Sequence, residues 1–146
     1  MKKHFELFLS FLLLLSFITG CSEEDHITNN PIDLVDDYYN NTPVIVNTND
    51  NFTFTISAKN FDYVTDNELI FNNADSIVVT ITLTNASSNN SFFTLTDNNN
   101  KKLIDESLNT NKVIVRTDLG NVTPKKSLIN LNDFTGKLTI VVANKK

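Results

Sequence analysis

The fold class is decided by the stretch Phe52-Thr53-Phe54-Thr55-Ile56-Ser57-Ala58, in which apolar residues alternate with small hydroxyl residues. Successive side chains of a β-strand point to opposite faces, so this period of two indicates a strand with one buried and one exposed face. The alternation returns at residues 77–84, 93–96, 113–116 and 138–143. Threonine and β-branched residues suit a pleated surface. The pattern therefore predicts an antiparallel, all-β domain.

Weaker patterns predict further short strands at residues 44–47, 68–71, 102–106 and 127–131. About seven to nine short strands, spaced by roughly 8–12 residues, are typical of a sandwich or a barrel. A domain of this length holds one hydrophobic core. We expect residues 44–146 to form a small antiparallel β-sandwich. Its expected architecture is immunoglobulin-like, although the cysteine and tryptophan signature of antibody domains is absent.

Asparagine-rich segments separate the predicted strands. Residues 85–90 and 97–102 have the composition of hairpin loops. Asparagine and aspartate tolerate positive φ better than most residues, which matters because the predicted domain contains only the glycines Gly120 and Gly136. We expect both glycines to lie in turns. The segment Asn60–Tyr63 is interpreted as a loop, with the Tyr63 ring packed on the edge of the sandwich.

The N-terminus has the features of an export signal. Lys2 and Lys3 precede an apolar run from Leu7 to Ile18. This run is shorter than the roughly 20 residues that a membrane-spanning helix needs, and it fits the core of a signal peptide, which is about 7–15 residues long. No later segment is as hydrophobic, so we expect no permanent transmembrane helix.

The apolar run ends in Ile18-Thr19-Gly20-Cys21, which resembles the lipobox of bacterial lipoproteins. In that family a dedicated signal peptidase cleaves before the cysteine, whose thiol carries a diacylglycerol and whose amino group takes a further acyl chain such as palmitate. The resemblance implies that residues 1–20 are removed and that Cys21 is the site of lipid attachment. Two or more acyl chains hold a protein stably at a membrane. Cys21 is also the only cysteine, so a disulfide within the chain is excluded.

Residues 21–43 are expected to form an acidic, flexible tether. The segment after Cys21 contains no lysine or arginine and holds the acids Glu23, Glu24, Asp25, Asp33, Asp36 and Asp37. Residues 44–146 are balanced in charge, so they lack the basic surface that binds nucleic acid. For the segment 31–39, a short helical turn and a first edge strand both remain open.

The residues Ser22-Glu23-Glu24-Asp25 follow the lipidated cysteine directly. A short acidic cluster at this place resembles the surface-export signal of some Gram-negative lipoproteins. In that family an aspartate at the second position of the mature chain is a signal for retention at the inner membrane. This sequence has Ser22 at that position. The resemblance implies a lipid-anchored protein of the outer membrane, exposed at the cell surface. The alternative is a solvated linker that no receptor reads.

The residue types of the predicted domain exclude much enzyme chemistry. The histidines are His4, in the signal peptide, and His26, in the tether. Without histidine or cysteine, residues 44–146 offer no Ser–His–Asp or Cys–His catalysis and no metal site built on imidazole or thiolate. Neither a phosphate loop nor a dinucleotide-binding glycine motif is present. We expect no cofactor, no metal and no enzymatic activity.

Some residues nevertheless offer chemistry. Two groups of carboxylates, Asp62 with Asp66 and Glu68, and Asp105 with Glu106, leave a carboxylate-based hydrolase as a remote alternative. The run from Asp97 to Asn100 contains oxygen ligands for calcium, but it lacks the glycine and the distal glutamate of a calcium loop, so we interpret it as a hairpin tip.

Ser76 is a candidate modification site. The tripeptide Asp75-Ser76-Ile77 resembles the acceptor of the O-glycosylation systems found in bacteria that export surface lipoproteins. A serine just before a strong strand is reachable. The resemblance is short and implies no more than a candidate acceptor.

The sequence favours a non-enzymatic binding or adhesion module, with an extracellular glycan or protein as ligand. The alternative is a periplasm-facing accessory subunit that docks on another outer-membrane protein through a sheet face or an edge strand. Val78, Ile114 and Val141 interrupt the polar faces of the predicted strands and are candidates for such a contact. A second layer that covers them is the competing explanation. Oligomeric state is left open.

Overall fold

The computed structural model describes residues 38–71 and 76–145, and Asp37–Lys146 form one compact unit. Seven antiparallel strands build it, with the bounds β1 (Val44–Asn47), β2 (Asn51–Glu68), β3 (Ile77–Ser87), β4 (Phe92–Asp97), β5 (Lys102–Ser107), β6 (Thr110–Arg116) and β7 (Pro124–Asn144). Nowhere in the described chain is there a helix with the length and hydrophobicity needed to span a bilayer. The predicted small, antiparallel, all-β architecture is confirmed.

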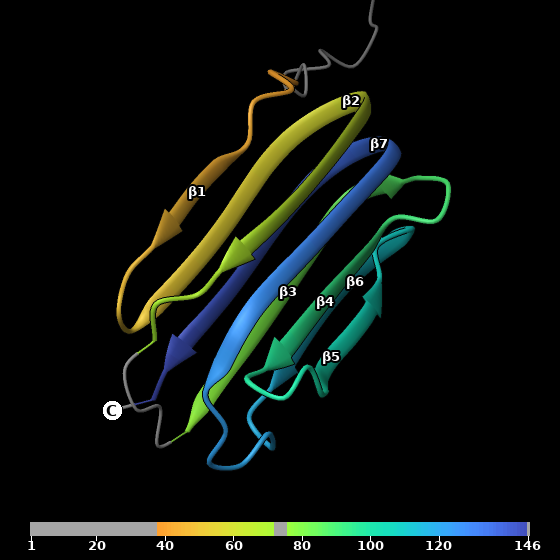
Figure 1. Ribbon diagram of the computed structural model, residues 1–146. Helices are drawn as coiled ribbons and strands as arrows, with labels where there is room; N and C mark the ends of the chain where they lie inside the picture. The colour runs from red at the N-terminus through yellow and green to blue at the C-terminus, as the bar shows by residue number, and fades with distance from the viewer. Residues whose placement is uncertain (1–37, 72–75, 146) are drawn as a thin grey trace, which may run out of the picture. The chain divides into compact units, whose positions relative to one another are not determined.

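Two long strands, β2 and β7, each belong to both layers of the sandwich. The wide layer consists of β1, residues 51–58 of β2, residues 136–144 of β7, β3 and β6. The narrow layer consists of the second half of β2, the first half of β7, β4 and β5. Figure 1 shows β2 and β7 arching over together at one end of the domain. The sheet therefore folds back on itself without closing into a barrel.

The core lies between the layers and is built by the alternating residues that the sequence predicts. Phe52, Phe54, Phe93 and Phe134 are fully buried, together with isoleucines, leucines and valines of both layers. Burying a side chain of this size contributes about 1.5–3 kcal/mol. One continuous apolar cluster thus holds the two layers together.

The inward face changes parity where the long strands arch over. In the wide layer the even-numbered residues of β2 and β7 point into the core, and in the narrow layer the odd-numbered residues do. The change occurs at two pairs of exposed residues, 59–60 in β2 and 132–133 in β7, where the register of the ladder shifts. A bulge of this kind lets one strand turn a corner and enter the second sheet.

Side chains of the two strands fix this corner to each other. Asn60 and Asp133 both have φ of 48°. The backbone N–H of Asn60 donates to Thr135 Oγ1 at 3.0 Å, and Thr135 Oγ1 donates to Asn60 Oδ1 at 3.1 Å. The backbone N–H of Asp133 donates to Asp62 Oδ1 at 2.7 Å. The backbone groups released by the bulge thus find partners across the β2–β7 ladder.

The observed strands differ from the predicted strands in three places. Residues Asn60–Tyr63 are not a loop, because β2 continues through them. Residues 68–71 do not form a strand, since β2 ends at Glu68. The predicted strands at 127–131 and 138–143 are two halves of β7. The Tyr63 ring packs at the edge of the sandwich as expected, in the half of β2 that borders the narrow layer, where it stacks on Phe61 at 5.8 Å between centroids.

Gly136 also differs from expectation, whereas Gly120 lies outside the strands as expected. Gly136 is an interior residue of β7 with φ of 132°, and a Cβ there would lie 2.8 Å from the Cα of Ala86 in β3. The position demands glycine because β3 approaches closely. Elsewhere asparagine supplies the positive φ, as expected, at Asn41, Asn60, Asn85, Asn90 and Asn100.

Residues 38–43, the end of the predicted tether, are hydrogen-bonded to β2. The backbone N–H groups of Asn40 and Asn41 donate to the Ser57 carbonyl at 3.0 and 3.1 Å. Lys59 N donates to Asn41 Oδ1 at 2.8 Å. The chain therefore joins the sandwich beside the arch and then continues along the edge of the wide layer as β1.

Candidate functional site

Several predicted site residues lie outside the described part of the chain. They are Cys21, Ser22, Glu23, Glu24 and Asp25. Ser76 lies just before β3 and is partly exposed, and its carbonyl accepts a hydrogen bond from Lys145 N at 2.8 Å. The hydroxyl of Ser76 thus belongs to a surface position next to a well-paired strand.

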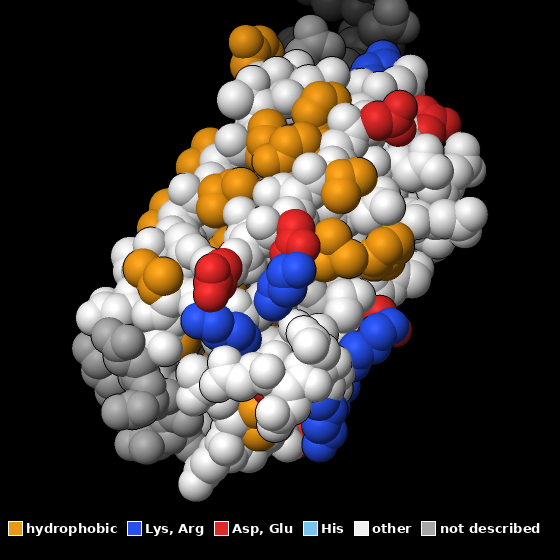
Figure 2. All heavy atoms as spheres, viewed as in Figure 1, with side chains coloured by type: hydrophobic (Ala, Val, Ile, Leu, Met, Phe, Trp, Pro, Cys, Tyr) orange, Lys and Arg blue, Asp and Glu red, His pale blue; other side chains and the backbone are white. Residues whose placement is uncertain are grey.

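The acidic residues at the end of β2 lie on the narrow layer and are engaged by neighbours. Asp66 pairs with Lys126 at 2.6 Å and Glu68 pairs with Lys125 at 3.0 Å. Asp62 accepts a backbone N–H of β7 at the corner. Figure 2 shows neighbouring acidic and basic side chains on this side of the molecule. The arrangement is that of a charged, solvated surface, where each pair contributes about 0–1 kcal/mol.

The second acidic group is divided by the strand on which it lies. Asp105 and Glu106 are consecutive in β5, so their side chains point to opposite faces. Lys102 Nζ lies 2.7 Å from Asp105 Oδ2, and Thr94 Oγ1 donates to Asp105 Oδ1 at 2.9 Å. These two hydrogen bonds, the one from Lys102 foremost, lower the pKa of Asp105. A lowered pKa is the reverse of what a general acid at neutral pH needs.

The outer surface of the wide layer has a different character, and we name it the threonine–valine face. The strand register aligns Val46, Thr53, Val141, Thr80 and Val115 in one row, and Val44, Thr55, Thr139, Thr82 and Val113 in the next. The face is completed by Asn51, Ser57, Val78, Thr84, Lys137 and Ala143.

Charge is nearly absent from the threonine–valine face, where Lys137 is the single ionisable side chain. Threonine hydroxyls and valine methyl groups make up most of its surface. Thr55 and Thr139 share a hydrogen bond of 3.1 Å between their Oγ1 atoms. Val113 and Val115 are 69% and 59% exposed on β6. Depletion of charge distinguishes the cores of protein interfaces from other surface, so this face is the candidate contact surface.

The three apolar residues singled out in the sequence divide between the two sides of the wide layer. Val78 and Val141 lie on the threonine–valine face, partly exposed and not covered by the narrow layer. Ile114 is opposite Ile81 in the ladder and packs against the core. The strand at 113–116 is therefore oriented opposite to expectation, with Val113 and Val115 outward.

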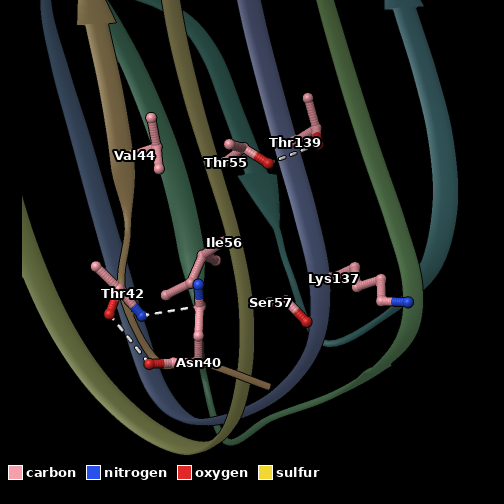
Figure 3. A pocket seen from close by; sticks show the side chains of 8 residues that line it. All are labelled: Asn40, Thr42, Val44, Thr55, Ile56, Ser57, Lys137 and Thr139. Carbon is pink, nitrogen blue, oxygen red and sulfur yellow. Dashed lines mark hydrogen bonds between the residues drawn. The ribbon is translucent and has the colours of Figure 1, made fainter. Parts of the chain in front are cut away.

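A shallow groove of about 310 Å³ lies where residues 40–44 run beside β2 and β7. Figure 3 shows its lining, with Thr55 and Thr139 hydrogen-bonded on one side and Asn40 and Thr42 on the other. Thr42 N donates to Asn40 Oδ1 at 3.2 Å. The groove extends the threonine–valine face toward the β1 edge, where Val44, Ile45 and Val46 are exposed.

A second pocket, of about 280 Å³, lies at the end of the domain opposite the arches. We call it the loop-end pocket; it is lined by Asp97, Asn98, Asn99, Asn121, Val122 and Thr123. The β4–β5 turn and the β6–β7 connection meet there, as Figure 1 shows. The prediction that residues 97–100 form a hairpin tip is confirmed, because β4 and β5 pair on either side of it.

Sequence reasoning finds neither surface as a unit. The face combines residues from β1, β2, β7, β3 and β6, and the pocket combines two loops more than 20 positions apart.

Within the described chain, no three histidine, cysteine, aspartate or glutamate residues converge as a metal site would require. The chain matches no protein-family model, and no curated protein sequence matches it. Its function must therefore be inferred from these surfaces.

Proposed function

We propose that the protein is a lipid-anchored, non-enzymatic binding module, displayed at the surface of the outer membrane, whose threonine–valine face binds a partner protein. The observation that carries this proposal is the contrast between the two layers. The narrow layer presents ion pairs such as Lys126 with Asp66, whereas the face across the wide layer presents hydroxyls and methyl groups. Such a nearly uncharged surface costs less to desolvate than a surface of ionised side chains.

The lipobox resemblance of Ile18-Thr19-Gly20-Cys21 supports the anchor, and the acidic run after it supports export. The engaged carboxylates of β2 and β5 favour binding over hydrolysis. The same face also suits the alternative function, a periplasm-facing subunit that docks on another outer-membrane protein.

Ser76 remains a proposed O-glycosylation acceptor. The test is whether the intact mass of the native protein shows hexose-sized additions.

Protease treatment of intact cells distinguishes a location at the cell surface from a location in the periplasm. Protease added outside is expected to destroy the domain without lysis, as followed by an antibody against it. Replacing Glu23, Glu24 and Asp25 together with alanine is expected to protect the domain until the outer membrane is opened, because the variant keeps Cys21 but loses the acidic cluster. A periplasmic protein that stays intact in both samples is the control. Protection of the unmodified protein would contradict surface export and favour the periplasmic alternative.

The face itself is tested by photo-crosslinking in living cells. A photoreactive residue in place of Val115 is expected to give an adduct of discrete size. The matched control is the same substitution at Val64, which is similarly exposed, at 64%, but lies on the narrow layer. In a second chain carrying the probe at Val113, Val115→Asp is expected to suppress the adduct, because it places a charge within the contact. Equal adducts from Val115 and Val64 would reject the face as the specific contact.

A further inference from the structure

We infer that the loop-end pocket is a binding site for one unit of an uncharged saccharide. This inference concerns a second surface, separate from the threonine–valine face, and adds a ligand class to the proposed binding role. The pocket lies at the end of the domain remote from Tyr38, whose carbonyl accepts a hydrogen bond from Ser57 Oγ near the arch. The pocket is thus at the far end of the sandwich from the place where the chain enters it.

The pocket is formed by a turn whose geometry is fixed. Asp97 Oδ1 accepts the backbone N–H groups of Asn99 at 2.8 Å and Lys101 at 2.9 Å. The backbone of Asn100, with φ of 59°, closes the turn by donating to the Asp97 carbonyl at 3.1 Å. The carboxylate of Asp97 is therefore held in place before any ligand arrives, which lowers the entropy cost of binding.

The asparagine side chains that line the pocket are exposed to solvent, so their amides are open to a ligand. Within the described chain, the side-chain amides of Asn98, Asn99 and Asn121 make no hydrogen bond to protein. Each amide offers two donors and one acceptor with two lone pairs. A sugar hydroxyl both donates and accepts, so neighbouring hydroxyls of a sugar ring match this mixture of amides with the Asp97 carboxylate. Val122 adds an apolar contact for the C–H groups of the ring.

Charge and size limit the ligand class. Asp97 is the single ionisable residue in the lining, and no lysine or arginine lines the pocket. Phosphate and other anions are therefore disfavoured, because their recognition relies on cationic donors. Calcium prefers six to eight oxygen ligands, commonly with several carboxylates. The volume of about 280 Å³ lies just under the range of roughly 300–1,000 Å³ for small-molecule sites, which suits a single sugar ring.

Ligand-observed NMR with the mature lipoprotein tests the inference, in a detergent without a sugar headgroup. The probes are the methyl glycosides of glucose, galactose, mannose and N-acetylglucosamine. Saturation transfer from the protein to at least one of them is expected, and it should persist in EDTA because no cation is required. Absence of transfer to all four probes would overturn the inference. Transfer that EDTA abolishes would overturn direct recognition by the amides.

Matched variants assign the binding to the pocket. Replacing Asn98 and Asn121 together with alanine is expected to weaken binding by about tenfold or more, since the hydrogen bonds of two side-chain amides to the sugar are lost. Asn49→Ala, in the exposed β1–β2 turn, is the control and should bind normally. Thermal unfolding confirms that both variants are folded. Unchanged binding by the double variant would overturn the inference, whereas crosslinking at Val115 reports on the proposed function independently.

Discussion

Replacing Gly136 with alanine is expected to destabilise the domain by about 3 kcal/mol or more. Two effects add. The backbone φ of 132° is one that residues with a Cβ rarely adopt, and the new Cβ would lie 2.8 Å from Ala86 Cα and from Asn85 O. These atoms belong to the backbone of β3, so they cannot rotate away. A small domain has a free energy of unfolding of about 5–15 kcal/mol. Urea-induced unfolding of the mature protein should therefore show that the variant has lost a large part of this free energy.

Gly120→Ala is the matched control for this change. Gly120 also has a positive φ, of 70°, but nothing lies within 4 Å of the position that a Cβ would take there. Its replacement should cost about 1–2 kcal/mol, which reflects the backbone conformation alone. A Gly136→Ala variant that unfolds at the same urea concentration as Gly120→Ala would show that β3 does not approach β7 as described.

The strand content of the domain follows directly from its alternation of residues. Where one face of a strand is buried, as for Phe52 and Phe54 in β2, every second residue must be apolar, and this alternation is visible in the sequence. The corner is different. Lys59 and Asn60 are two consecutive exposed polar residues, which look the same in sequence whether they form a loop or a bulge in one long strand. Only the hydrogen bonds across to β7 distinguish them.

Strand β6 shows a second limit of sequence reasoning. The residues Val113, Ile114 and Val115 are all apolar, so alternation does not say which face is inward. Pairing with β3 decides it, because Ile114 lies opposite the buried Ile81. The threonine–valine face cannot be found from the sequence for a related reason. The central strands contribute mostly threonines and the outer strands β1 and β6 contribute valines, and the nearly uncharged surface exists only once long-range pairing has placed these residues next to one another.

Cys21→Ser is expected to abolish lipid attachment completely. A serine hydroxyl cannot form the thioether to diacylglycerol, and without that lipid the lipoprotein peptidase is not expected to remove residues 1–20. Radiolabelled palmitate should enter the unmodified protein and not the variant. Intact mass should show the mature chain with its acyl chains in the first case and the full-length precursor in the second. The effect is all-or-none because Cys21 is the only cysteine of the sequence, so the variant has no thiol to which the diacylglycerol could be joined.

Membrane fractionation alone does not test this prediction, since an uncleaved apolar run from Leu7 to Ile18 can itself hold the precursor at the inner membrane. Palmitate incorporation and mass are therefore the deciding measurements. Ser22→Ala is the control, because it changes the neighbouring residue and leaves Ile18-Thr19-Gly20-Cys21 intact; it should be labelled and cleaved normally. Palmitate in the Cys21→Ser variant would contradict Cys21 as the attachment site and place the lipid on another residue. A mature unmodified protein without acyl mass would contradict the lipid anchor altogether. The domain would then be an exported protein without a lipid, and its surface display would need another explanation.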